Sequence, residues 1–161
     1  MIGNDIVDLA LARKQSNWKR TGFLDKIFTA KEQLLIANAE NPEIMVWNLW
    51  SRKEAAYKIY NRQTGIRLYI PIQLECFYEN EYSGSVRCRG NTYYTKTEIS
   101  EAKIATVAVI RKSDFKEIIV VKPTAMVHKK NGVPYLLDAN NLEKPFSISH
   151  HGRFATWVSL K

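Results

Sequence analysis

The chain has 161 residues and a mass of 18.6 kDa, a length that predicts a single domain over residues 1–161. Hydrophobic residues make up 45% and charged residues 25%, which excludes a disordered or low-complexity chain. The formal net charge of +8 favours an anionic partner, but charge alone does not choose among nucleic acid, a phosphate-rich cofactor, an acidic protein and a membrane surface.

Cysteine usage and the N-terminal residues predict a cytoplasmic protein with reduced thiols. Cys76 and Cys88 are too few for a disulfide framework and do not have metal-ligand spacing. The acidic sequence Met1–Asp8 differs from the basic start of a signal peptide, and no apolar run approaches the roughly 20 residues of a membrane span. The basic residues are scattered and match no nucleic-acid recognition motif, so we expect neither a membrane nor a nucleic-acid partner.

The first third of the chain carries the signals of helices. Residues 5–20 are expected to begin as the end of a strand and to continue as a helix with a solvated basic face. The basic residues of that face are Arg13, Lys14, Lys19 and Arg20. Thr29–Glu32 has the capping-box pattern S/T-x-x-E and predicts a helix start. Asn41 followed by Pro42 predicts another start, with good helix formers as far as about Tyr60.

The remainder of the chain is rich in strand signals. Residues 66–77 carry β-branched and aromatic residues in partial alternation, and turn residues downstream suggest a β-meander with an additional hairpin around residues 76–103. Asn131–Gly132 predicts a two-residue hairpin turn. Further strands are expected over residues 104–110, 118–121, 146–150 and 154–160. The predicted class is α+β, with an antiparallel sheet packed against helices.

One stripe of the predicted third helix combines aromatic and charged residues. At 3.6 residues per turn its members lie within roughly 60° of one another. They are Trp47, Trp50, Glu54 and Lys58. A solvated Glu54–Lys58 pair beside a core stripe is one interpretation. The alternative is functional, because a carboxylate drawn into a partly apolar cleft is costly unless a cation satisfies it.

Two other segments carry candidate ligand-binding groups. Asp5 follows a glycine and a short polar residue, which suits an oxygen ligand for a hard cation such as Mg²⁺, although Asp5 or Asp8 could simply cap the next helix. Residues 147–153 place hydroxyls, imidazoles and Arg153 around a turn, where they could bind phosphate, although His150 could equally be an ordinary surface histidine.

Taken in order, these segments resemble the 4'-phosphopantetheinyl transferase superfamily, in particular its short, holo-acyl-carrier-protein synthase-like branch. The matching segments are Gly3–Leu9, Phe28–Glu32, Trp50–Lys58 with Thr64–Gly65, and Gly132–Tyr135 leading to Ser147–His150. The resemblance implies an α+β transferase fold and transfer of the phosphopantetheine arm of coenzyme A to a serine of an acyl or peptidyl carrier protein. It also implies a requirement for Mg²⁺ and release of 3',5'-ADP.

The resemblance also implies roles for individual residues. Asp5 and Glu54 would hold the metal against the diphosphate, and Glu54 could accept the serine proton. Lys58 would neutralise charge on the diphosphate, so Glu54 and Lys58 are the expected catalytic pair. The expected coenzyme A contacts are Lys53, Lys58, His150 and Arg153, with His150 and Arg153 at the nucleotide end.

Some residues depart from the family pattern. Val7 stands where the longer branch carries an additional acidic residue, so the chain resembles the short branch, whose members form trimers with sites between subunits. A homotrimer is therefore an expectation. Gly132–Val133–Pro134 replaces the more usual Gly-Lys-Pro, which puts nucleotide contacts in that loop in question. The alternative function is a non-catalytic basic module that binds an acidic protein or nucleic acid.

Overall fold

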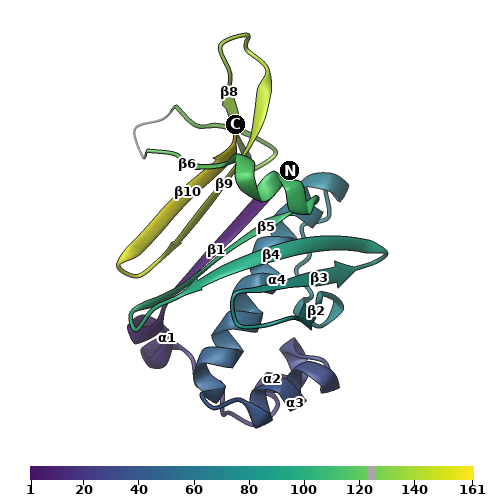
Figure 1. Cartoon of the computed structure of the whole chain (residues 1–161), viewed down its shortest axis with the longest axis vertical. Helices are drawn as coiled ribbons and strands as arrows, with labels where there is room; N and C mark the ends of the chain where they lie inside the picture. Colours follow the sequence, from purple (N-terminus) through teal and green to yellow (C-terminus); the bar gives the residue numbers. More distant parts are fainter. Residues whose placement is uncertain (123–125) are drawn as a thin grey trace.

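The computed structural model describes residues 1–122 and 126–161, which form two five-stranded antiparallel sheets and a set of helices (Figure 1). The helices are α1 (Leu9–Gln15), α2 (Phe23–Ile27), α3 (Ala30–Asn38) and α4 (Pro42–Thr64), with 3₁₀ turns at Pro71–Gln73 and Lys112–Glu117. The first sheet has the strand order β1 (Ile2–Asp8), β5 (Lys103–Val109), β4 (Asn91–Ile99), β3 (Ser83–Cys88) and β2 (Glu75–Tyr78). The second has the order β6 (Ile118–Val120), β10 (Phe154–Leu160), β9 (Glu143–His151), β8 (Val133–Leu137) and β7 (His128–Lys130). The predicted α+β class is confirmed.

The helix starts follow the capping signals of the sequence. The Thr29 side chain accepts from the backbone of Glu32, whose carboxylate accepts from the Thr29 backbone, so the capping box is present. The Asn41 side chain caps α4, and Gly65 ends that helix in the left-handed conformation (φ 71°). The prediction of a strand from residue 66 is wrong as far as residue 74. Pro71 opens a 3₁₀ turn, and the strand begins only at Glu75.

Helix α4 packs across the first sheet and approaches β1 very closely. A Cβ atom added to Gly3 would lie 2.1 Å from the backbone carbonyl oxygen of Ala55. Only glycine at position 3 therefore allows β1, which carries Asp5, to lie so close to α4, which carries Glu54.

Side chains of β9 join the second sheet to the free edge of β1. Among the strands of the described residues, β1 pairs only with β5, so the backbone N–H groups on its other edge need different partners. Alternate N–H groups of β1 donate to alternate side chains of β9, at 2.9–3.0 Å. The pairs are Asn4 with Ser147 Oγ, Ile6 with Ser149 Oγ, and Asp8 with His151 Nδ1. This row of three hydrogen bonds, the β1–β9 seam, places residues 143–160 beside α4 and β1.

Cys76 and Cys88 are both buried and free. Within residues 1–122 and 126–161, no helix is long and apolar enough to cross a membrane.

Candidate active site

Asp5 and Glu54 line the same cavity. This cavity, of about 260 Å³, lies where β1, α1, α4 and β9 meet, and we call it the acidic cavity. Trp47 and Trp50 form part of its wall, and His150 lines it from the end of β9. Asp5 is the one residue of β1 that is not fully buried, because the cavity opens onto it. The structure thus brings together the two predicted metal ligands and His150.

The two carboxylates and Lys58 influence one another's protonation. Burial and the negative charge of Asp5 raise the pKa of Glu54 to about 7, against the opposing effect of Lys58. Burial also raises the pKa of Asp5, with Lys58 and a hydrogen bond from Ser149 acting in the opposite direction. Burial lowers the pKa of Lys58, whereas both carboxylates raise it. One ammonium thus faces two carboxylates, and an additional cation would relieve their repulsion.

Several buried polar atoms in and around the acidic cavity are left without a partner. Asp5 Oδ2 makes no hydrogen bond to any described residue, and the same holds for the Ser51 hydroxyl and Trp47 Nε1. The Tyr69 hydroxyl also has no hydrogen bond of acceptable geometry, although it faces Glu54, and burial together with the charge of Glu54 raises the pKa of Tyr69. Buried polar groups are normally satisfied, so this concentration of polar atoms without partners indicates a polar ligand.

The donor set of the cavity fits Mg²⁺ bound together with a phosphate ligand. Mg²⁺ is usually held by one or two carboxylates, with water and substrate phosphate oxygens in the other positions. Asp5 and Glu54 supply two carboxylates, and Val7 occupies a wall position that could have carried another. In the described part of the chain, no group of three or more His, Cys, Asp or Glu side chains could hold a metal by itself.

Lys58 bridges β1 and β9 instead of pairing directly with Glu54. Its ammonium donates to the carbonyl oxygens of Asn4 (2.6 Å) and Ile148 (3.0 Å). No ion pair within 4.0 Å joins Glu54 and Lys58 among the residues described, so the solvated-pair interpretation of the stripe is wrong. The ammonium is fixed at the wall between the two sheets, close enough to the carboxylates to act on their charges.

Asp8, rather than Asp5, is the helix cap. Its carboxylate accepts from the backbone of Ala10 and Leu11 at the start of α1. The Arg153 guanidinium donates to both Asp8 oxygens (2.8 and 2.7 Å), and this contact holds the pKa of Asp8 well below its usual range. The Arg153 guanidinium is thus bound by Asp8 and does not line the acidic cavity, so a contact between Arg153 and coenzyme A stays a prediction.

The prediction that Lys53 binds coenzyme A is corrected by the structure. Lys53 is completely buried, and its ammonium forms an ion pair with Glu32 at 2.8 Å. It also donates to the carbonyl oxygens of Pro71 and Leu74. With no exposed surface and three partners, Lys53 fixes α4 against α3 and the segment before β2 and cannot reach a ligand.

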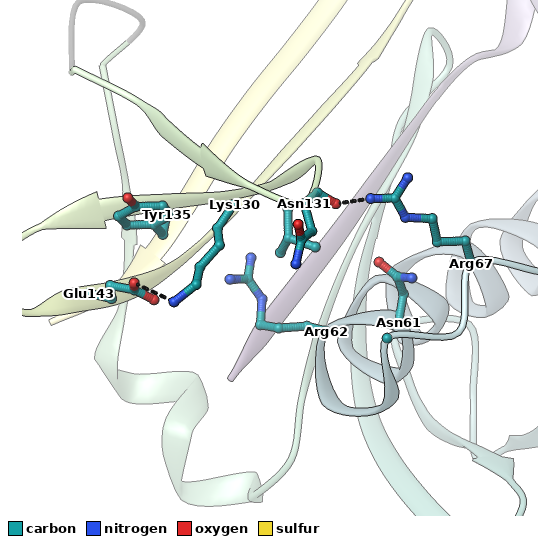
Figure 2. Close-up of a pocket in the computed structure, with 9 residues that line it drawn as sticks. Asn61, Arg62, Arg67, Lys130, Asn131, Tyr135 and Glu143 are labelled. Carbon is teal, nitrogen blue, oxygen red and sulfur yellow. Dashed lines mark hydrogen bonds and ion pairs between the residues drawn. The ribbon is translucent and has the colours of Figure 1, made fainter.

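A basic cavity lies at the other end of α4 and was not predicted from the sequence. It has a volume of about 420 Å³ and is lined by three basic side chains, Arg62, Arg67 and Lys130, and by Glu143, which forms an ion pair with Lys130 at 3.4 Å (Figure 2). Arg62 donates to the carbonyl oxygens of Pro134 and Phe146 through Nη2, while its buried Nε has no partner in the described structure. The Lys129–Lys130 pair before Asn131–Gly132 was the one sequence signal for this site.

A smaller pocket of about 200 Å³ adjoins the basic cavity along α4, and the two share Asn61, Arg62 and Val133 in their walls. It is lined by Lys58 and Arg62 from the helix, and by residues 132–134 and 146–148 from the second sheet. Glu54, Lys58 and Arg62 recur every four residues, so one face of α4 changes from acidic to basic over about 12 Å. This arrangement suits an elongated anionic ligand with a metal-bound group at one end.

Comparison with known proteins identifies the class of enzyme. Residues 1–110 match the model of the 4'-phosphopantetheinyl transferase superfamily, and the chain belongs to this superfamily. It is accordingly a 4'-phosphopantetheinyl transferase. A search of curated proteins gave no significant match.

Solved structures share the fold. Helicobacter pylori holo-[acyl-carrier-protein] synthase in complex with coenzyme A is 14% identical, with a TM-score of 0.52 over 69% of this chain and 100% of that chain. The Thermotoga maritima holo-[acyl-carrier-protein] synthase is also 14% identical, with a TM-score of 0.52 over 99% of this chain and 82% of that chain. The apo-ACPS of Chronobacterium ammoiniagenes is 12% identical, with a TM-score of 0.54 over 67% and 93% of the two chains.

Proposed function

We propose that this protein transfers the 4'-phosphopantetheine group of coenzyme A to a serine of an acyl or peptidyl carrier protein, in a reaction that depends on Mg²⁺ and releases 3',5'-ADP. The observation that carries the proposal is the shared cavity of Asp5 and Glu54, with a free, buried carboxylate oxygen on Asp5. Family membership and the match to a coenzyme A-bound synthase of the same fold support it.

The residues of the cavity suit phosphoryl transfer by alignment and charge neutralisation. The serine oxygen of the carrier bonds to the phosphorus that bears the pantetheine arm, and the bridging P–O bond breaks as 3',5'-ADP leaves. Glu54 accepts the serine proton directly or through water. Asp5 and Glu54 would hold Mg²⁺, which when bound supplies positive charge to the diphosphate oxygens. Lys58 stabilises negative charge on the same group.

The charge gradient along α4 sets the orientation of coenzyme A. With the diphosphate at the acidic cavity, the nucleotide extends past Lys58 toward Arg62, Arg67 and Lys130. His150 lines the acidic cavity, so in this orientation it contacts the diphosphate region and not the far nucleotide end that we expected from the sequence. The basic cavity binds the 3'-phosphate of the nucleotide.

The carrier protein would approach from the α1 side of the acidic cavity. Ala12 and Ser16 line that cavity, and the basic side chains next to them are exposed. Carrier proteins are generally acidic, and complementary charge speeds encounter. The exposed basic residues are Arg13, Lys14, Lys19 and Arg20.

The direct test incubates the protein with apo-carrier, coenzyme A and Mg²⁺ and weighs the carrier by mass spectrometry. Attachment of phosphopantetheine is expected, and loss of attachment when Mg²⁺ is chelated. No added mass on any of several carriers would refute the proposal. Salt-sensitive binding to nucleic acid without affinity for coenzyme A would instead support the alternative, a non-catalytic basic module.

We further propose that one chain carries a complete site, in contrast to the expected homotrimer with sites between subunits. Asp5, Glu54 and His150 line one cavity within a single chain because the β1–β9 seam brings β9 to β1, and Lys58 bridges the same two strands. Mixing two inactive variants tests this: Glu54→Gln, and His150→Glu, which adds a negative charge to the cavity. If each chain holds its own site, the mixture stays inactive, whereas recovered activity would show that subunits share sites.

A further inference from the structure

Ser149 connects the Asp5 side chain to the backbone of its own strand. Its hydroxyl accepts a hydrogen bond from Ile6 N at 2.9 Å and donates one to Asp5 Oδ1 at 3.2 Å. Ser149 is buried, with 5% of its surface exposed, so water does not compete for these bonds. The hydroxyl belongs to β9, in the part of the chain beyond the residues 1–110 that match the family model.

The geometry of this contact leaves one carboxylate oxygen free. A hydroxyl has a single hydrogen, and the Ile6 N–H occupies one of its lone pairs, so the hydrogen is directed to Asp5 Oδ1. Oδ2 is then the oxygen without a partner among the described residues. Asp5 lines the acidic cavity, and its carboxylate accepts a hydrogen bond of acceptable geometry at Oδ1, whereas Oδ2 is buried without a partner among the described residues, although Ser51 is close enough to help lower the pKa of Asp5.

We propose that Ser149 is a positioning residue, which orients Asp5 so that Oδ2 is presented to the cation. This inference rests on the proposed function. Hydrogen bonds to metal-ligating carboxylates orient the ligand and contribute to metal affinity. Ser149 acts through Asp5, because its single hydroxyl hydrogen is directed to Asp5 Oδ1 and its hydroxyl oxygen accepts from Ile6 N.

The chain supplies a matched control in Ser147. Two residues earlier on β9, it is equally buried and its hydroxyl accepts from Asn4 N at 3.0 Å, yet no bond joins it to Asp5 in the described structure. Ser147→Ala and Ser149→Ala each remove one hydroxyl from the β1–β9 seam and leave one backbone N–H of β1 without its partner. Their structural costs should be similar, and only Ser149→Ala releases Asp5.

The experiment measures Mn²⁺ binding to the full chain by electron paramagnetic resonance, without carrier protein and with coenzyme A at a concentration that saturates each variant, because Ser147 lines the smaller pocket. Urea denaturation of both variants is measured in parallel. We expect Ser149→Ala to weaken Mn²⁺ binding about tenfold or more and Ser147→Ala less than about twofold, with similar denaturation midpoints for the two variants. Equal Mn²⁺ affinity in the two variants would overturn the positioning role of Ser149. Failure of the unmodified protein to bind Mn²⁺ would refute the proposed function itself, so the two failures are distinguishable.

Discussion

Replacing Glu54 by glutamine should stabilise the metal-free protein while abolishing its activity. In the folded chain the pKa of Glu54 is raised from 4.5 to about 7 by burial and by Asp5. Between these values the folded state keeps a proton that the unfolded state has released, so the free energy of unfolding falls as pH rises through this range. Glutamine carries no charge, so the Glu54→Gln variant does not lose this part of its free energy of unfolding as pH rises. The stabilising effect is therefore absent near pH 4.5 and complete above about pH 7.

The size of the stabilisation by Glu54→Gln follows from the difference between the two pKa values of Glu54. At about 1.4 kcal/mol per pH unit, the range from 4.5 to about 7 gives an upper bound of about 3 kcal/mol at pH 8. With a urea m-value of about 2 kcal/mol/M, the denaturation midpoint of Glu54→Gln would rise by up to about 1.5 M. Activity should fall more than about a hundredfold, because the variant loses a metal ligand and the base.

Urea denaturation in a chelator at pH 5, 6, 7 and 8 measures the effect. Glu101→Gln is the control, since Glu101 is exposed and should show no pH-dependent difference from the unmodified protein. The quantity to compare is the difference in stability between Glu54→Gln and the unmodified protein. If this difference is no larger at pH 8 than at pH 5, the description of Glu54 as a buried carboxylate beside a second carboxylate is contradicted.

Three other substitutions test the supports of the site. Gly3→Ala places a Cβ against the Ala55 carbonyl and should cost about 1–3 kcal/mol in urea denaturation, with reduced transfer activity; an unchanged midpoint would contradict the close approach. Lys53→Met leaves the Glu32 carboxylate buried without its cation and should cost about 3–5 kcal/mol, and adding Glu32→Gln should recover part of it; no loss in the single variant would contradict the buried pair. Arg67→Gln should weaken coenzyme A binding about tenfold in calorimetry but change binding of 3'-dephospho-coenzyme A little, and an equal effect on both ligands would exclude Arg67 from the phosphate subsite.

Local signals predicted the helices well. The capping box at Thr29 and the Asn41–Pro42 start depend on contacts within one helical turn, which the sequence displays directly. The stripe of α4 was also readable, because helical spacing alone places Trp47, Trp50 and Glu54 on one face, and all three line the acidic cavity. Residues 66–74 were misassigned because their β-branched and aromatic composition favours a strand while Pro71 favours a turn.

The features of the site that the sequence did not reveal concern partners that are distant along the chain. Lysine is usually a surface residue, so the sequence predicts an exposed Lys53. Only the fold reveals that Glu32 and two carbonyl groups bind its ammonium in the core. Arg153 is bound by Asp8, which is 145 residues away in sequence. The alternation of Ser147, Ser149 and His151 on one side of β9 was a visible pattern, but their function depends on the free edge of β1, which is set by the topology.

The central claim is that Asp5 and Glu54 hold a divalent cation against the diphosphate of coenzyme A. Calorimetric titration of coenzyme A into the protein, with and without Mg²⁺, tests it most directly. The account predicts binding that is strengthened by Mg²⁺ in the unmodified protein, and no such strengthening in Glu54→Gln. Binding with the same affinity in the presence and absence of Mg²⁺ would contradict it.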